Sequence, residues 1–210
     1  MKTRIFNLII IDESGSMQSI KSAAIDSVNE TIQTIRSAQK KNEEQEHFVS
    51  LVAFNSDVKT IYECVAVDDV KELTEETYQP GCCTALYDAM GISLGALRKK
   101  VAEEGKVLVT VVTDGYENAS REYNGKAIKA LVDELKAKGW VFAYIGANQD
   151  VEAVAATISI TNTLSFNATT AGVLGMSGIL GRSRERLYRC MTVSDFDAAE
   201  ANKSFFDEEK

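Results

Sequence analysis

The sequence predicts an α/β fold built on an open, mostly parallel six-stranded sheet with helices on both faces. Short apolar runs alternate with longer amphipathic segments along its 210 residues, which is the order found in parallel α/β sheets. The run Lys106–Thr113 (KVLVTVVT) is the most uniformly β-branched and suits a central strand that is buried on both faces. A link of three residues, Asn55–Asp57, joins two neighbouring apolar runs and predicts a hairpin, which makes one edge strand antiparallel.

Each element follows from the spacing of apolar residues. Six strands are expected, at Arg4–Ile11, His47–Phe54, Val58–Val67, Lys106–Thr113, Trp140–Ala147 and, more weakly, Thr163–Ala168. Helices are expected at Gln18–Lys41, Thr84–Val101, Gly125–Gly139, Val151–Thr157 and Ala171–Met191. The first helix, for example, places Ile25, Val28 and Ile32 near the spacing of one helix face. Asn148 and Asp150 are expected to cap the short helix that follows them.

Composition indicates one globular domain over residues 1–210. The chain is 45% hydrophobic and 26% charged, which leaves enough apolar side chains for a sizeable core. A single proline argues against a proline-rich linker. Residues 195–210 form an acidic C-terminal tail, in which Phe205 and Phe206 are expected to pack on the domain.

Charge and hydropathy narrow the range of partners. A formal net charge of −8 disfavours non-specific binding to nucleic acid or to an anionic membrane, because phosphates would be repelled. The apolar run Ile5–Ile11 is too short to span a bilayer and no cleavage site follows it, so we expect no membrane association. A cytoplasmic location is expected, where the four cysteines would stay reduced.

Polar residues gather where the predicted strands end. Asp12, Ser14 and Ser16 alternate directly after the first strand, so that their side chains can converge on one point. Asp114 follows the central strand and Thr84 precedes a helix, both able to reach the same edge of the sheet. Hard oxygen donors without histidine or cysteine suit magnesium or calcium and do not suit zinc or copper. Two carboxylates and three hydroxyls leave at least one coordination position open.

With these residues in view, the sequence resembles a von Willebrand factor A (vWA) domain with a complete metal-ion-dependent adhesion site (MIDAS). That family's motif is Asp-x-Ser-x-Ser, then a distant threonine, then an aspartate after the central strand. DESGSM, TALYDA and VTDGYEN match the three parts in this order. The resemblance covers roughly the whole chain and implies the family's Rossmann-like fold.

The resemblance also implies roles for the five residues. Ser14, Ser16 and Thr84 would bind the metal through their hydroxyls, and Asp12 and Asp114 would bind it directly or through water. The implied metal is Mg²⁺, with Mn²⁺ or Ca²⁺ as alternatives. The open position would accept a Glu or Asp side chain of a partner protein. The implied function is thus protein interaction without catalysis, in the single-domain cytoplasmic form common in bacterial and phage settings.

The adjacent thiols of Cys82 and Cys83 raise a different hypothesis, namely a redox pair or half of a zinc site. A zinc site needs two more ligands, and the sequence offers only Cys64, Cys190 and one histidine, without C-x-x-C spacing. Adjacent cysteines also pair poorly with each other, because the ring they would close strains the intervening peptide bond. We therefore expect the thiols to be incidental, although two cysteines in place of glycine put the conformation of this loop in doubt.

A hydrolase or phosphatase that uses Ser14 or Asp12 as nucleophile is the alternative function. ESGSM is not the G-x-S-x-G turn of α/β-hydrolases. A serine nucleophile would need a histidine base, and His47 opens the second strand, at the opposite edge of a parallel sheet. Nucleotide binding is disfavoured because both glycine-rich phosphate-binding motifs are absent from the sequence.

Other polar residues carry structural interpretations. His47 is expected to be structural, and Glu117 and Asn118 are expected to lie on a loop surface. Four arginines of the last helix are expected on a solvated face, at Arg182, Arg184, Arg186 and Arg189. Asp12, Ser14 and Ser16 could also be a polar turn that caps a helix, and Thr84 an N-cap.

Overall fold

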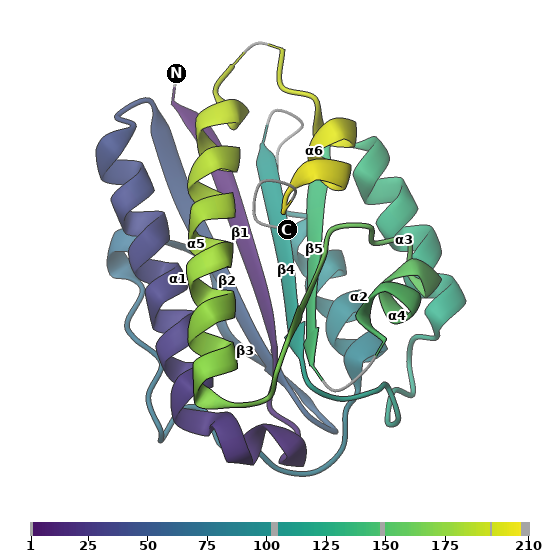
Figure 1. Cartoon of the computed structure of the whole chain (residues 1–210). Coiled ribbons are helices and arrows are strands. Elements are labelled where there is room, and N and C mark those ends of the chain that lie inside the picture. The colour runs from purple at the N-terminus through teal and green to yellow at the C-terminus, as the bar shows by residue number, and fades with distance from the viewer. Residues whose placement is uncertain (1, 102–104, 148–149, 194, 207–210) are drawn as a thin grey trace.

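The computed structural model describes residues 2–101, 105–147, 150–193 and 195–206, and its six strands form one sheet (Figure 1). The strands are β1 (Thr3–Asp12), β2 (Gln45–Phe54), β3 (Val58–Ala66), β4 (Lys106–Thr113), β5 (Trp140–Ala147) and β6 (Thr163–Phe166). Their order is β3-β2-β1-β4-β5-β6, and every neighbouring pair is parallel except β2 and β3. The predicted fold class, with its antiparallel edge strand, is therefore confirmed.

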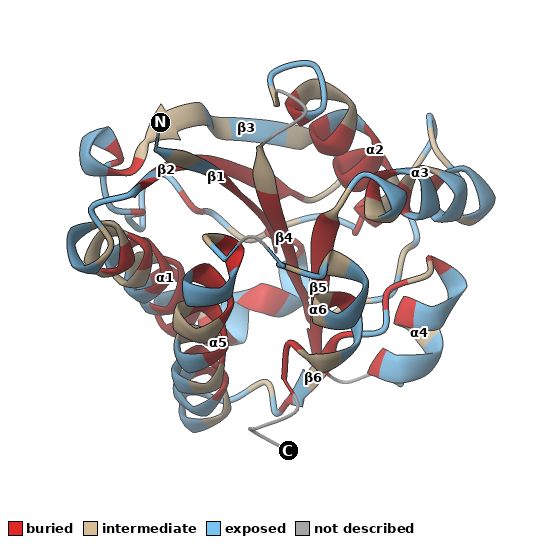
Figure 2. Cartoon of the chain, turned by 90° about the horizontal axis from the view of Figure 1, so that it is seen from above, coloured by how far each residue is buried: buried red, intermediate tan, exposed pale blue. Residues whose placement is uncertain are grey.

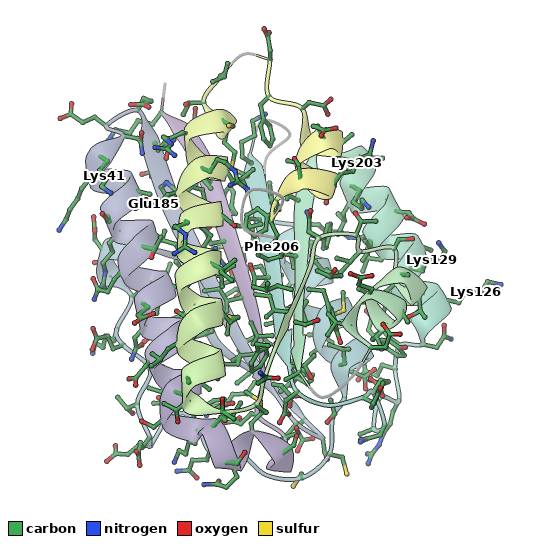
Figure 3. The ribbon with its side chains drawn as sticks, viewed as in Figure 1. Lys41, Lys126, Lys129, Glu185, Lys203 and Phe206 are labelled. Carbon is green, nitrogen blue, oxygen red and sulfur yellow. The ribbon has the colours of Figure 1, made fainter. Side chains whose placement is uncertain are left out.

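Helices cover both faces of this sheet. They are α1 (Lys21–Lys41), α2 (Leu86–Leu97), α3 (Gly125–Ala137), α4 (Val151–Thr157), α5 (Thr170–Met191) and α6 (Ala198–Ser204). Two 3₁₀ turns, η1 (Gly15–Ile20) and η2 (Val67–Asp69), complete the elements. Helices α1, α5 and α6 pack on one face, and α2, α3 and α4 pack on the other (Figures 1 and 2). On the first face, Lys41 of α1 donates to Glu185 of α5 at 3.0 Å, and Figure 3 labels both side chains.

Strand β1 shows how alternation builds two cores from one strand. Ile5, Ile9 and Ile11 belong to the core under α1 and α5, whereas Phe6 and Leu8 belong to the core under α2 and α3. Successive side chains of a strand point to opposite faces, so a run of apolar residues fills both cores at once. The sequences of the central strands are therefore continuous apolar runs. Figure 2 shows these strands almost wholly buried.

The C-terminal segment is more ordered than the expected acidic tail. Its residues 198–204 form helix α6, whose Asn202 accepts a hydrogen bond from the Phe142 amide at 3.0 Å and donates to the Trp140 carbonyl at 2.8 Å. Phe205 and Phe206 are 3% and 1% exposed, which confirms that they pack on the domain (Figure 3 labels Phe206). Residues 207–210 lie outside the described part of the chain.

The two expected helix caps have different outcomes. Helix α2 begins at Leu86, and Ala85 occupies its N-cap position, so Thr84 does not cap it. Asp150 does cap α4, because its carboxylate accepts a hydrogen bond from the Ala153 amide at 3.0 Å; Asn148 lies outside the described residues. Among the described helices, none combines the length and the apolar character needed to cross a membrane.

A chain of polar side chains crosses the core between α5 and the sheet. Arg184 donates to the Tyr188 hydroxyl at 3.0 Å, and Tyr188 donates to the Asn7 side chain at 2.6 Å. The Asn7 side-chain nitrogen also lies 3.4 Å from His47 Nδ1, and His47 Nε2 lies 2.9 Å from Gln45 Oε1. The structural interpretation of His47 is confirmed. The solvated position expected for Arg184 is wrong, because this side chain is fully buried and hydrogen-bonded to the polar groups of the core.

His47 makes the stability of the fold depend on pH. Burial, and then the charge of Arg184, lower the pKa of His47 from about 6.5 to about 4. Between these two values the unfolded chain binds a proton that the folded chain does not, so stability is complete above about pH 6.5 and falls as the pH drops towards 4. We expect the unfolding free energy of the wild type to fall by about 3 kcal/mol over this range because of His47. His47→Gln should lack this fall, since glutamine does not titrate. Urea unfolding of both proteins at several pH values measures the difference, and parallel curves would contradict the prediction.

Glycines of α5 give a second test of the packing. A Cβ added at Gly175 would have no heavy atom within 4 Å, so Gly175→Ala should raise the unfolding free energy by about 0.5–1 kcal/mol through a less flexible unfolded chain. At Gly172 the added Cβ would lie 2.1 Å from the Asn167 carbonyl oxygen, so Gly172→Ala should destabilise the protein. Urea unfolding of the two variants should shift in opposite directions; equal shifts would contradict the packing of this helix.

Candidate functional site

The candidate site lies at the carboxyl edge of the sheet, where β1 and β4 end side by side. Their parallel pairing sets Ile11 opposite Val112, so Asp12 and Thr113 come next at the same level. The Thr113 hydroxyl donates to the Asp12 carboxylate at 2.5 Å and so joins the two strand ends directly. Adjacent parallel strands therefore bring together residues that are about a hundred positions apart in the chain.

The Asp-x-Ser-x-Ser turn folds back onto Asp114. The Ser14 amide donates to the Asp12 carboxylate at 2.7 Å, which closes the turn after β1. The Ser14 and Ser16 hydroxyl oxygens are 3.1 Å apart, and the Ser16 hydroxyl donates to Asp114 at 2.5 Å. Hydrogen bonds thus connect four of the five predicted site residues.

Thr84 reaches the same group from the loop before α2. A methyl group built at Gly115 would lie 3.1 Å from the Thr84 hydroxyl, 3.7 Å from Asp12 Oδ2 and 3.8 Å from Ser16 Oγ. One point beside Gly115 is therefore within 4 Å of three of the predicted residues, of which Asp12 and Ser16 belong to the turn after β1 and Thr84 to the loop before α2. The structure brings all five predicted residues together.

Two residues that were expected on a loop surface hold this arrangement in place. The Asn118 side chain accepts a hydrogen bond from the Thr84 amide at 2.9 Å, and the Asn118 amide donates to the Thr84 carbonyl at 3.0 Å. The Glu117 carboxylate accepts hydrogen bonds from the Tyr87 amide at 2.9 Å and the Ser120 amide at 2.7 Å. Both residues lie in a loop, where Asn118 is exposed and Glu117 is half-buried, so the expected surface position is confirmed for Asn118. Their hydrogen bonds add a role in holding the site that a surface position alone does not imply. Their partners lie mostly far away in the sequence, so no local pattern could have indicated the role of Asn118.

Gly115 was also missed by the sequence analysis. A glycine after an aspartate reads by default as a turn residue. Here the glycine is needed because any side chain would enter the space between Thr84, Asp12 and Ser16.

Burial makes the two carboxylates of the site unusually basic. It raises the pKa of Asp12, with a smaller increase from the Asp114 charge, against the lowering effect of hydrogen bonds from Thr113 and Ser14. Burial also raises the pKa of Asp114, against a hydrogen bond from Ser16. No ion pair among the described residues includes either carboxylate. Such a pair of buried carboxylates is a suitable environment for a bound cation.

The cysteine pair occupies the loop that leads to Thr84. Cys82 adopts a left-handed backbone with φ of 63°, and its carbonyl accepts a hydrogen bond from the Gly15 amide at 3.1 Å. All four cysteines are unpaired, and both thiols of the pair are exposed. Within the described residues there is no group of three His, Cys, Asp or Glu side chains that could hold a metal ion. The loop conformation is indeed unusual, and its contribution to the site is a backbone contact.

His47 lies far from the serines along the sheet. It pairs with Ile5 near the start of β1, whereas Ser14 follows the end of that strand. Its ring is fully buried and hydrogen-bonded to Gln45. The expected separation of His47 from Ser14 is therefore observed.

Solved structures of other proteins share this fold at low sequence identity. Proximal thread matrix protein 1 from the mussel byssus matches with a TM-score of 0.59 and 12% identity, over 86% of this chain and 46% of that chain. The D319A mutant of the PilB minor pilin from Streptococcus sanguinis matches with a TM-score of 0.61 and 13% identity, over 92% and 64%. The ArnB paralog VWA2 from Sulfolobus acidocaldarius matches with a TM-score of 0.55 and 17% identity, over 86% and 45%.

These likenesses show the fold alone, and the chain spans less than two thirds of each of those structures. A further structure of the mussel protein, with a TM-score of 0.56 and 13% identity over 88% of this chain and 46% of that chain, has a zinc-occupied MIDAS motif. No curated protein sequence matches the chain.

The family model for the von Willebrand factor type A domain matches residues 8–176, which include all five predicted site residues. The sheet order, the single antiparallel edge strand and the arrangement of helices agree with that match. The chain belongs to the von Willebrand factor type A domain family.

Proposed function

We propose that the chain is a divalent-metal-dependent protein-interaction module with a complete MIDAS, which binds an acidic residue of a partner protein. Asp12, Ser14, Ser16, Thr84 and Asp114 would hold the metal. The observation that carries the proposal is the point beside Gly115 that lies within 4 Å of oxygen atoms of Thr84, Asp12 and Ser16, which belong to two separate segments of the chain. A point surrounded by hydroxyl and carboxylate oxygens suits a hard divalent cation.

The chain's own residues would prepare this space for the ion. Asn118 fixes the backbone of Thr84, and the Asp12 carboxylate is oriented by the Ser14 amide and the Thr113 hydroxyl. A preformed set of donors keeps the ordering cost of binding low. The bound ion would supply positive charge and an open coordination position for a partner's carboxylate.

The donor set supports Mg²⁺, with Mn²⁺ or Ca²⁺ as alternatives, because hydroxyls and carboxylates are hard ligands. The zinc found in the mussel protein's MIDAS motif supports divalent binding in this family without deciding which ion this chain takes. We propose that direct thiol ligation plays no part here.

An exposed aromatic side chain beside the site supports a protein partner. Tyr116 follows Gly115 directly and is 55% exposed, although it is a large side chain. Tyrosine is enriched at protein interfaces and at their energetic centres. We propose that Tyr116 contacts the partner next to the acidic residue that reaches the metal.

We propose binding without turnover, in the cytoplasm of a bacterial or phage system. The position of His47 near the opposite end of β1 supports the absence of a serine–histidine hydrolase at this edge. The four unpaired cysteines support a reducing location. Hydrolysis of a generic phosphate ester that is abolished by Asp12→Asn would overturn the proposal of binding without turnover.

The metal site is tested by Gly115→Ala, with Gly81→Ala as the matched control. At a hundredfold excess over the dissociation constant, Mg²⁺ or Mn²⁺ should stabilise the wild type by about 2.7 kcal/mol. The Gly115→Ala methyl group would fill the space between Thr84, Asp12 and Ser16 and should abolish this effect. Gly81 lies in the neighbouring loop with open space around its Cβ position, so Gly81→Ala should retain it.

Thermal unfolding with and without metal, together with calorimetric titration, measures this difference. Absence of metal binding by the wild type would overturn the proposed site. Equal binding by wild type and Gly115→Ala would place the ion elsewhere.

The partner is tested by affinity capture on the immobilised chain, in Mn²⁺ or in EDTA. A protein captured in Mn²⁺ should be lost in EDTA and should fail to bind Gly115→Ala. In both cases the metal ion that attracts the partner's carboxylate would be missing. Replacing the partner's acidic residue by its amide should weaken capture at least tenfold. Capture that is insensitive to EDTA would contradict a metal-dependent interaction.

A further inference from the structure

The core between α5 and the sheet contains a positive charge without a negative partner. Arg184 is fully buried under α5. None of the ion pairs among the described residues includes it. The guanidinium stays protonated in proteins, and a buried charge is costly unless it is paired.

Hydrogen bonds satisfy only part of this guanidinium. One terminal nitrogen donates to the Tyr188 hydroxyl at 3.0 Å, and the other donates to the Thr110 hydroxyl at 2.6 Å. The remaining nitrogen, Nε, is buried and has no hydrogen-bond partner in the described part of the chain. A buried polar atom without a partner in a native protein commonly marks a bound water or ion.

The hydrogen-bond network around Arg184 does not neutralise the charge. The Tyr188 hydroxyl donates its proton to the Asn7 side-chain oxygen, and the Asn7 amide nitrogen faces His47 Nδ1. His47 Nε2 therefore carries the ring proton and donates to Gln45, whose amide nitrogen donates to the Tyr188 carbonyl. These partners are all neutral, so the charge of Arg184 remains uncompensated.

A cavity lies beside Arg184. Its volume is about 20 Å³, and it is lined by residues of η1, α1, α5 and the strands β1, β4 and β6. Most of its lining is aliphatic, but the hydroxyl residues Ser27, Thr31 and Thr110 line it together with Arg184. A cavity above roughly 10–15 Å³ has room for one water-sized particle.

We propose that this cavity binds one small monovalent anion of the halide class, held by Arg184 and the Thr110 hydroxyl. Thr110 accepts a hydrogen bond from Arg184, which leaves its own proton free to donate to the anion. The anion would neutralise the buried guanidinium and so strengthen the attachment of α5 to the sheet. A water molecule would fill the same space and leave the charge uncompensated.

The proposal predicts a specific chloride effect on stability. The melting temperature of the wild type should rise by a few degrees from sodium gluconate to sodium chloride at equal ionic strength, and the rise should saturate. Arg184→Met should abolish the difference. Arg189→Met removes the same charge from an exposed position of α5 and should behave like the wild type.

Each alternative outcome is decisive. Equal melting temperatures of the wild type in both salts would overturn the proposal, and so would an equal chloride effect in wild type and Arg184→Met. Crystals of the wild type grown in bromide should show an anomalous peak in the cavity beside Arg184, which keeps the test valid should Arg184→Met fail to fold. Absence of that peak would overturn the proposal of a bound anion and would indicate that water fills the cavity.

Discussion

The parallel pairing of β1 with β4 is the constraint on which the rest of the site depends. Because the two strands run side by side in register, their ends place the Asp12 carboxylate and the Thr113 hydroxyl 2.5 Å apart. The loops after β1 and β4 could not by themselves hold their carboxylates in this position, because a loop lacks the strand pairing that fixes its position along the sheet. The cores on both faces of β1 oppose a shift of this register, because a shift by one residue would exchange the side chains between two packed cores and would remove Asn7 from its hydrogen bond with Tyr188.

The other loops of the site are held by hydrogen bonds between side chains and backbone groups. Asn118 holds the loop of Thr84, and Glu117 ties its own loop to the start of α2. Asp88 of α2 accepts hydrogen bonds from the amides of Arg121, Glu122 and Tyr123, at 2.7, 2.9 and 2.8 Å. The aspartate side of the site and the threonine side are therefore fixed to each other before any ligand arrives. Such preorganisation suits a binding site, in which an ordering cost would reduce affinity.

Sequence reasoning recovered what local periodicity and a short motif encode. The strands and most helices follow from the spacing of apolar residues, and the five oxygen donors follow from a known order of motifs. Helix α6 was missed because its contact with the sheet depends on Asn202, whose partners lie about 60 residues away. Arg184 was misplaced because an arginine in an arginine-rich helix looks solvated, and only packing shows which face of the helix is buried. Gly115 and Asn118 act through spatial neighbours that have no signature in the local sequence.

Two groups of opposite charge, each outside the ion pairs of the described residues, thus lie next to β4, namely Arg184 of α5 and Asp114 directly after the strand. Thr110 binds Arg184, and Asp114 follows four residues later, at roughly 13 Å for an extended strand. Two unit charges separated by a distance of this order interact by about 1 kcal/mol with an effective dielectric constant of 20. A cation bound at Asp114 would neutralise the negative charge that attracts the Arg184 guanidinium. It would thereby favour the binding of an anion beside Arg184. Because coupling between binding sites is reciprocal, an anion in the core would strengthen cation binding at the edge of the sheet by the same factor. An anion in the core beneath α5 would then change the affinity of the proposed metal site through electrostatics alone.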